Sequence, residues 1–246
     1  MKEQAICYKI DTAINRCRNI VVMGHVDPDA DCIGAMLAIK LALENETRKI
    51  DAVLANQPPD NLFFLPGIEQ IIPLEQYQQK PDMILLVDCS DLERAGAEAM
   101  IESWRDIPIA VIDHHDSATP MGDLLWIKPA ASATCELIYE LLKNLQIPLN
   151  KEIATCIYAG IVSDTGCFRY QNTTPECFIY ASDLLTYHID TQLVRVQLFE
   201  CRTLASIKMI GTAMVSLEEV EPWLVMMKLT IADKQKYGAR AQDCNN

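Results

Sequence analysis

Four short, largely apolar runs, each followed by polar residues, constrain the fold of this chain more than any other feature of its sequence. They cover residues 20–23, 50–54, 83–87 and 109–112. Continuous apolar runs of this length are typical of strands that are buried on both faces. Apolar residues at helical spacing follow the first run, over residues 33–43. This succession predicts an α/β fold, with a doubly wound and mainly parallel sheet.

Three of these runs end in residues that bind metal ions. The first leads into His25-Val26-Asp27-Pro28-Asp29-Ala30-Asp31, the third into Asp88, and the fourth into Asp113-His114-His115. Because ligands bind beyond the carboxyl ends of parallel strands, we expect these side chains to meet at one edge of the sheet. A mixed set of Asp and His favours Mn²⁺, Co²⁺, Fe²⁺ or Zn²⁺. Two such ions that share a carboxylate can activate water against phosphorus.

Composition narrows the class of protein further. The ten cysteines are scattered without a CxxC pair, which predicts reduced, buried thiols and disfavours a thiolate zinc site. The formal net charge of −13 argues against a basic surface for long nucleic acid. The sequence contains no uninterrupted run of about 18 apolar residues, so it predicts no membrane span. The first residues lack a secretory signal. We therefore expect a cytoplasmic protein.

The remaining sequence predicts further helices and one further strand. Residues 2–18 have the pattern of an amphipathic helix, and Ser132-Ala133-Thr134 reads as a side-chain-capped helix start. Residues 191–217 stay helical, and residues 223–231 form a strand candidate with no partner segment after it. We expect a metal-binding domain at 1–190, a helical connector at 191–217 and the start of an incomplete C-terminal domain at 218–246.

Together these residues resemble the DHH phosphoesterases. The closest resemblance is to the branch of nano-RNases and 3′-phosphoadenosine-5′-phosphate phosphatases, which is related to RecJ exonuclease and family II inorganic pyrophosphatase. It covers about residues 1–230. Four motifs carry it, in this order: His25 to Asp31 with Gly34, Val87-Asp88, Asp113-His114-His115, and Gly160 to Arg169 with Asp164-Thr165-Gly166 at its centre.

The resemblance implies a two-ion site, most favourably for Mn²⁺, with Mg²⁺ or Co²⁺ as alternatives. By motif position, one ion would be held by His25, Asp29 and Asp88. The second would be held by the following four residues, with Asp88 bridging: Asp31, Asp88, His114 and Asp164. A hydroxide shared by the two ions would attack phosphorus.

Three further residues receive roles from the same resemblance. His115 matches the histidine that contacts the substrate phosphate, and Asp113 would orient a neighbouring ligand. Arg169 either binds substrate phosphate or pairs with a structural carboxylate. The sequence also departs from the family: Ala35 stands where Ser is usual, and Cys32 replaces a small apolar residue. The family's C-terminal DHHA1 domain, with its Gly-rich motif, has no counterpart before Asn246.

Three functional hypotheses follow. The first is a metal-dependent hydrolase that acts on short oligoribonucleotides, linear dinucleotides or 3′-phosphoadenosine-5′-phosphate. The second is a weakly active or inactive module that binds nucleotide and metal. The third, which the motif from Asp164 to Arg169 makes less favourable, is an inorganic pyrophosphatase. Among partners we expect a short nucleotide substrate, no long nucleic acid and no membrane, and the apolar connector helices leave a homodimer open.

Overall fold

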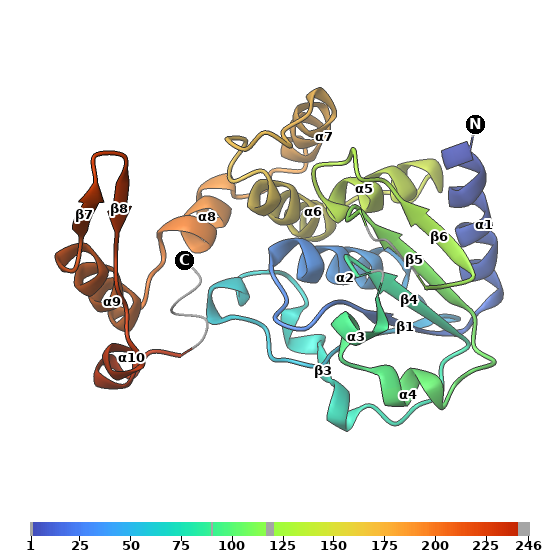
Figure 1. Cartoon of the computed structure of the whole chain (residues 1–246). Coiled ribbons are helices and arrows are strands. Elements are labelled where there is room, and N and C mark those ends of the chain that lie inside the picture. Colours follow the sequence, from blue (N-terminus) through green and yellow to red (C-terminus); the bar gives the residue numbers. More distant parts are fainter. Residues whose placement is uncertain (1, 90, 117–120, 241–246) are drawn as a thin grey trace. The chain divides into compact units, whose positions relative to one another are not determined.

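The computed structural model describes residues 2–89, 91–116 and 121–240, and these form two compact units (Figure 1). The first unit extends from Met1 to Leu198 and the second from Phe199 to Asn246. The sequence-based division at 190 and 217 stays a prediction, and its last residues, 241–246, lie outside the described ones.

A six-stranded parallel sheet forms the centre of the first unit. Its spatial order is β3-β2-β1-β4-β5-β6, and every neighbouring pair is parallel. The strands are β1 (Asn19–Met23), β2 (Lys49–Leu54), β3 (Ile72–Pro73), β4 (Met83–Val87), β5 (Ile109–Asp113) and β6 (Leu124–Ile127). The sheet confirms the predicted doubly wound α/β fold.

Helices cover both faces of the sheet (Figure 1). On one face lie α2 (Ala30–Leu43), α5 (Thr134–Asn144) and α6 (Lys151–Asp164), with α7 (Pro175–Leu185) beyond them. On the other lie α3 (Leu92–Ala95) and α4 (Glu98–Glu102), while α1 (Lys2–Arg16) packs beside β6. Three short 3₁₀ turns lie between β2 and β4, at Asp60–Leu62, Ile68–Gln70 and Leu74–Gln76.

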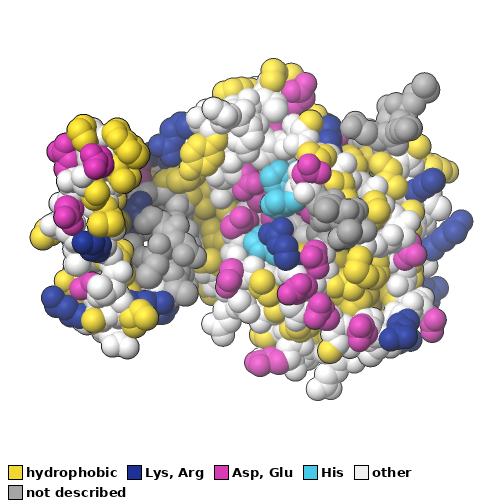
Figure 2. Space-filling model, in the orientation of Figure 1, with side chains coloured by type: hydrophobic (Ala, Val, Ile, Leu, Met, Phe, Trp, Pro, Cys, Tyr) yellow, Lys and Arg dark blue, Asp and Glu magenta, His cyan; other side chains and the backbone are white. Residues whose placement is uncertain are grey.

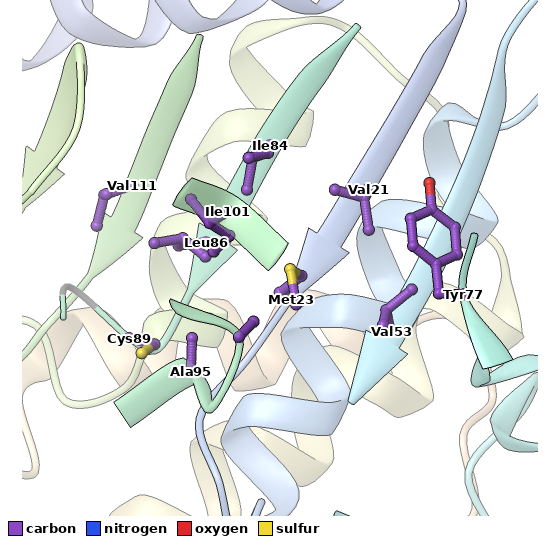
Figure 3. Close-up of a cluster of buried hydrophobic side chains, with 11 residues drawn as sticks. Val21, Met23, Val53, Tyr77, Ile84, Leu86, Cys89, Ala95, Ile101 and Val111 are labelled. Carbon is purple, nitrogen blue, oxygen red and sulfur yellow. The ribbon is translucent and has the colours of Figure 1, made fainter. Parts of the chain in front are cut away.

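Alternate residues of each central strand face opposite helical layers. Val21 and Met23 of β1 point toward α3 and α4, where they pack with Ile84, Leu86 and Ile101 (Figure 3). The intervening Val22 is equally buried on the side of α2. Apolar side chains on both faces explain why these strands read as continuous apolar runs in the sequence.

The winding direction of the sheet changes between β1 and β4. The chain moves outward from β1 through β2 to β3, returns to β4 beside β1, and continues through β5 to β6. Open α/β sheets form a crevice at such a switch point, beyond the carboxyl ends of the strands. His25 follows β1 and Asp88 follows β4, so the fold places both residues at this crevice.

The chain from Thr191 onward differs from the sequence-based expectation. Helix α8 (Thr191–Arg195) continues as a π-helical turn, Val196–Glu200, and α9 (Leu204–Val215) begins only after a break. The strand candidate is shorter than predicted, and its partner comes before it. β7 (Glu218–Glu221) pairs antiparallel with β8 (Leu224–Met226), and α10 (Ile231–Tyr237) follows. The sequence prediction of a strand over 223–231 was too long, and it missed β7, whose acidic residues hide its alternation.

None of the described helices is long and apolar enough to cross a lipid bilayer.

Candidate metal centre

The loop after β1 brings a buried imidazole to the edge of the sheet. His25 is only 8% exposed, and its Nε2 atom lies 3.3 Å from Oδ2 of Asp88. The other ring nitrogen, Nδ1, lies 2.7 Å from the carbonyl oxygen of Val26, which it can meet as a donor. That contact assigns the proton to Nδ1 and leaves the lone pair of Nε2 facing Asp88.

The two aspartates at the start of α2 have different environments. Asp29 is exposed and is the N-cap of the helix, with Oδ1 accepting hydrogen bonds from the amides of Asp31 and Cys32 at 2.9 and 3.0 Å. Asp31 is fully buried, and its carboxylate lies against the first turn of α5. There the amides of Thr134 and Cys135 donate to it at 2.6 and 2.9 Å.

This contact corrects the expected start of α5. The sequence predicted that Ser132 or Thr134 would cap the helix through its own hydroxyl, but no side chain caps α5 locally. Instead, the first-turn amides bind Asp31 of α2, Ser132 donates to Glu136, and Thr134 Oγ1 donates to Asp88. A carboxylate from another helix therefore satisfies these amides. Its negative charge also complements the positive end of the helix dipole.

Asp88 lies at the centre of the cluster. It is 1% exposed, has a left-handed backbone with φ of 55°, and accepts a hydrogen bond at Oδ1 from Thr134 at 2.9 Å. Its two oxygens face different imidazoles: Oδ2 faces His25, and Oδ1 lies 3.6 Å from Nε2 of His114 and 3.4 Å from Nδ1 of His115. A carboxylate with both oxygens engaged in this way has the disposition of a bridging ligand.

His114 links Asp88 to the C-terminal end of α6. Its Nε2 atom lies 3.2 Å from Oδ2 of Asp164 and 4.0 Å from Oδ2 of Asp31. This nitrogen is buried, and it meets hydrogen-bond geometry with none of the described residues. A buried nitrogen enclosed by three carboxylates is what a site for a divalent cation provides.

His115 and Asp113 form a separate pair beside these groups. Oδ1 of Asp113 accepts from the backbone amide of His115 at 3.0 Å and lies 2.8 Å from its Nδ1. The Asp113 carboxylate is buried, whereas the His115 side chain is 40% exposed. Asp113 therefore fixes a ring whose remaining nitrogen can reach solvent or a substrate. Figure 2 shows histidine side chains among acidic ones near the middle of one face of the molecule.

Burial and mutual charge shift the protonation of this cluster. Burial raises the pKa of the Asp31 carboxyl well above its usual value, and the charges of Asp164 and Asp88 add to that effect. Burial also raises the pKa of Asp164, although His114 opposes it. For His114, burial would lower the pKa, but Asp164, Asp31 and Asp88 outweigh it and raise the pKa to about 10. The carboxylates and the imidazole of this cluster thus shift one another's pKa values, as closely packed buried charges do.

Three groups of side chains converge closely enough to hold an ion, with each group's ligand atoms all within 4.8 Å of one another. They are Asp31 with His114 and Asp164, Asp88 with His114 and His115, and His25 with Cys32 and Asp88. A pair of divalent cations fits this donor set, with Asp88 common to two of the three groups. Gly160 leaves room for it, because a Cβ there would lie 2.6 Å from Oδ1 of Asp31.

Two predicted residues lie differently from the rest. Asp29 is in none of the three groups, although its charge helps to raise the pKa of Asp164, so its role as a ligand stays a prediction. Arg169 is exposed, and its Nε atom donates to the carbonyl oxygen of Gly166 at 2.6 Å.

Sequence reasoning missed Thr134 as a partner of Asp88. Cys32 was noted only as a departure, and its place directly after Asp31, inside the first motif, was the available signal.

Comparison with known proteins places this chain in a family. A family model described as the DHH family, N-terminal domain, matches residues 19–161, which is more than half of the chain. Two curated relatives are named bifunctional oligoribonuclease and PAP phosphatase NrnA. The protein from Bacillus subtilis is 31% identical over 74% of this chain and 58% of its own length. The protein from Thermus thermophilus is 33% identical over 69% and 50%. The chain thus spans about half the length of the curated relatives it matches.

A solved structure extends the likeness of the fold. An exopolyphosphatase-related protein from Bacteroides fragilis superposes with a TM-score of 0.88 over 99% of this chain and 74% of its own, at 24% identity. The family match and the relatives confirm the resemblance that the sequence motifs suggested. In this chain His25, Asp88 and His114 follow the strands of an α/β domain. The chain belongs to the DHH family.

Proposed function

We propose that this protein is a hydrolase that uses two divalent cations to cleave phosphoester bonds in short nucleotide substrates. The substrates are short oligoribonucleotides, including linear dinucleotides, and 3′-phosphoadenosine-5′-phosphate. The observation that carries the proposal is the convergence of five predicted ligands at one sheet edge, each from a different element or loop: His25, Asp31, Asp88, His114 and Asp164. The names of the NrnA relatives support the substrate class.

The residues divide the work between holding cations and handling substrate. Asp88 would bridge the two ions, with His25 and Asp29 on one side and the other three ligands on the second. Two bound cations about 3.5–4 Å apart lower the pKa of a shared water and neutralise phosphate charge. Mn²⁺ suits this mixture of oxygen and imidazole donors, and Mg²⁺ or Co²⁺ are alternatives.

His115 is the group best placed to contact the substrate phosphate. Its side chain is 40% exposed, and the buried Asp113 holds it through Nδ1 at 2.8 Å. The same contact engages Nδ1 as a donor and leaves Nε2 to meet a phosphate oxygen, to which it donates when the ring carries both protons. Asp113 thus positions His115, and Arg169 offers a cationic group near the end of α6.

The net charge of −13 restricts which nucleotides can approach the site. A long nucleic acid binds mainly by phosphate neutralisation, which this composition opposes. A dinucleotide or a bisphosphorylated nucleoside carries few charges, and cations in the site can neutralise them. The composition therefore favours short substrates that the metal centre itself receives.

The test is hydrolysis of three substrates by the full chain, with Mn²⁺, Mg²⁺ or Co²⁺ present. These are a 5′-phosphorylated RNA dinucleotide, 3′-phosphoadenosine-5′-phosphate and pyrophosphate, with released mononucleotide or phosphate as the readout. We expect turnover of the first two, lost in Asp88→Asn and His114→Asn. His188→Asn is the matched control, because His188 is exposed and lies after α7, and it should retain activity.

The other two hypotheses are distinct outcomes of this assay. Two bound ions per chain with no turnover of any substrate would contradict the enzyme and leave a module that binds nucleotide and metal. A clear preference for pyrophosphate would favour the third hypothesis. Retained activity in Asp88→Asn would remove the bridging role of that carboxylate.

A further inference from the structure

A buried thiol lies directly beside the proposed metal centre. Cys32 is in the first turn of α2, one residue after Asp31, and its side chain is fully buried. Its sulfur fills the space above Gly24, where a Cβ would lie 2.1 Å from Sγ. Only glycine at that position lets the sulfur approach the backbone that carries His25.

The surroundings of this sulfur are those of a ligand group. Its Sγ atom, a carboxylate oxygen of Asp88 and a ring nitrogen of His25 all lie within 4.8 Å of one another. The two other atoms already face each other, with His25 Nε2 at 3.3 Å from Asp88 Oδ2. Bonds of about 2.3 Å to sulfur and about 2.0 Å to nitrogen or oxygen place neighbouring ligand atoms roughly 3.5 Å apart. The three atoms would have to approach to about this separation for one ion to bind all of them.

Asp29, the other ligand proposed for this ion, is engaged elsewhere in the structure. In the two-ion arrangement proposed above, Asp29 joins His25 and Asp88. In the structure its Oδ1 atom caps α2 by accepting from the amides of Asp31 and Cys32, and it belongs to none of the converging groups. In the structure the side chain that converges with His25 and Asp88 is Cys32, so its sulfur would add to the ligand set proposed above.

We propose that Sγ of Cys32 is a ligand of the ion held by His25 and Asp88, and that it gives this position a preference for Zn²⁺, Co²⁺ or Fe²⁺ over Mn²⁺. On binding, the S–H bond breaks, the sulfur donates its electron pair to the cation, and the proton passes to solvent. Thiolates select softer ions, whereas carboxylate and water ligands suit Mn²⁺ and Mg²⁺. This inference rests on the proposed two-cation function and adds the identity of one ligand.

Thiol coordination has an optical signature that does not depend on activity. The full chain is stripped of metal with a chelator and titrated with Co²⁺, and the near-ultraviolet thiolate-to-cobalt charge-transfer band is recorded. We expect the band in the natural chain and its loss in Cys32→Ala. Cys156→Ala is the matched control, because its thiol is also fully buried but lies 3.7 Å from the carbonyl oxygen of Pro66, in none of the converging groups.

X-ray absorption at the zinc edge provides an independent readout. We expect one sulfur at about 2.3 Å from zinc in the natural chain, and only nitrogen and oxygen at about 2.0–2.2 Å in Cys32→Ala. The ratio of Zn²⁺ to Mn²⁺ affinity should fall by at least about tenfold in that variant. Circular dichroism and the thermal midpoint report whether each variant is folded, and Cys32→Ser replaces Cys32→Ala if it is not.

Failure of this inference is distinct from failure of the proposed function. Natural protein that binds two Co²⁺ ions without the band, or a band that persists in Cys32→Ala, would overturn Cys32 as a ligand. If that protein still hydrolyses a dinucleotide with Mn²⁺, the proposed function stands. Protein that binds no divalent ion at all would overturn both.

Discussion

The side chains of the metal centre are held by groups that contribute no ligand themselves. Thr134 is fully buried and donates from Oγ1 to Oδ1 of Asp88, while its amide donates to Asp31. One residue therefore contacts two of the proposed ligands, one on α2 and one at the end of β4. Groups in this position orient ligands and raise their affinity for metal.

The hydroxyl of Thr134 gives a prediction about metal affinity. Thr134→Val keeps the shape of the side chain and the hydrogen bond from the backbone amide to Asp31. It removes the hydrogen bond from the hydroxyl to Asp88. We expect the affinity for Mn²⁺ to fall about 10- to 100-fold, as when other groups that orient ligands are lost. Titration calorimetry on the metal-free protein measures this change.

A conservative variant separates positioning from packing. Thr134→Ser retains the hydroxyl and should restore most of the affinity. Thr155→Val is the matched control, since Thr155 Oγ1 donates to the carbonyl of Lys151 within α6. Unchanged Mn²⁺ affinity in Thr134→Val would show that Asp88 is positioned without this hydroxyl.

Only part of the centre could be predicted residue by residue. His25, Asp88 and His114 follow apolar runs, so parallel topology alone brings them to one edge. The contacts of Asp31 with the amides of α5 join residues 103 and 104 positions apart. No local pattern encodes such a contact, because it depends on how two helices pack. For the same reason the sequence assigned the start of α5 a side-chain cap of its own.

At the level of elements, the sequence predicted the central strands better than the edge strands. β1, β2, β4 and β5 lie where the apolar runs are, because each is covered by helices on both faces. Edge strands lack this signal. β3 contains two residues, and β6 is mostly half-buried, so neither has a continuous buried run. The same reasoning explains why the acidic, exposed β7 was missed.

Helices α2 and α6 approach closely through glycine. A Cβ on Gly34 of α2 would lie 2.5 Å from the backbone carbonyl oxygen of Cys156 in α6. Backbone cannot move aside as the end of a flexible side chain can. The two helices carry Asp31 and Asp164, so their separation also sets the spacing of these proposed ligands.

We expect opposite outcomes for two Gly→Ala substitutions in helices, one at this contact and one at an open position. Gly34→Ala should destabilise the first unit by about 1–3 kcal/mol through overpacking, despite the better helix propensity of Ala. Gly211→Ala in α9 has nothing within 4 Å of the new Cβ and should stabilise its own unit by about 0.5–1 kcal/mol. Urea unfolding followed by circular dichroism measures both. A neutral Gly34→Ala would mean that α2 and α6 can separate at little cost.

On the scale of the whole molecule, the two units differ in how well they are buried. The first unit contains the sheet, its core and every proposed ligand. In the second unit large apolar side chains are exposed, including Val215 at 90% and Trp223 at 81%, and of its described residues only Ser206 and Met209 are buried. The proposed ligands and the contacts that hold them therefore all lie within the first unit.

A protein that contains only residues 1–198 should bind two divalent ions with the stoichiometry and affinity of the full chain. The physical reason is that the ligands, Thr134 and the amides of α5 all lie in the first unit and contact one another there. Metal content after dialysis and titration calorimetry with Mn²⁺ measure this, with Asp88→Asn in the same shortened protein as the control. A folded 1–198 protein that binds fewer than two ions would show that residues beyond Leu198 complete the site. If both ions bind but dinucleotide turnover falls, the second unit acts on the substrate, because the metal centre itself is then intact.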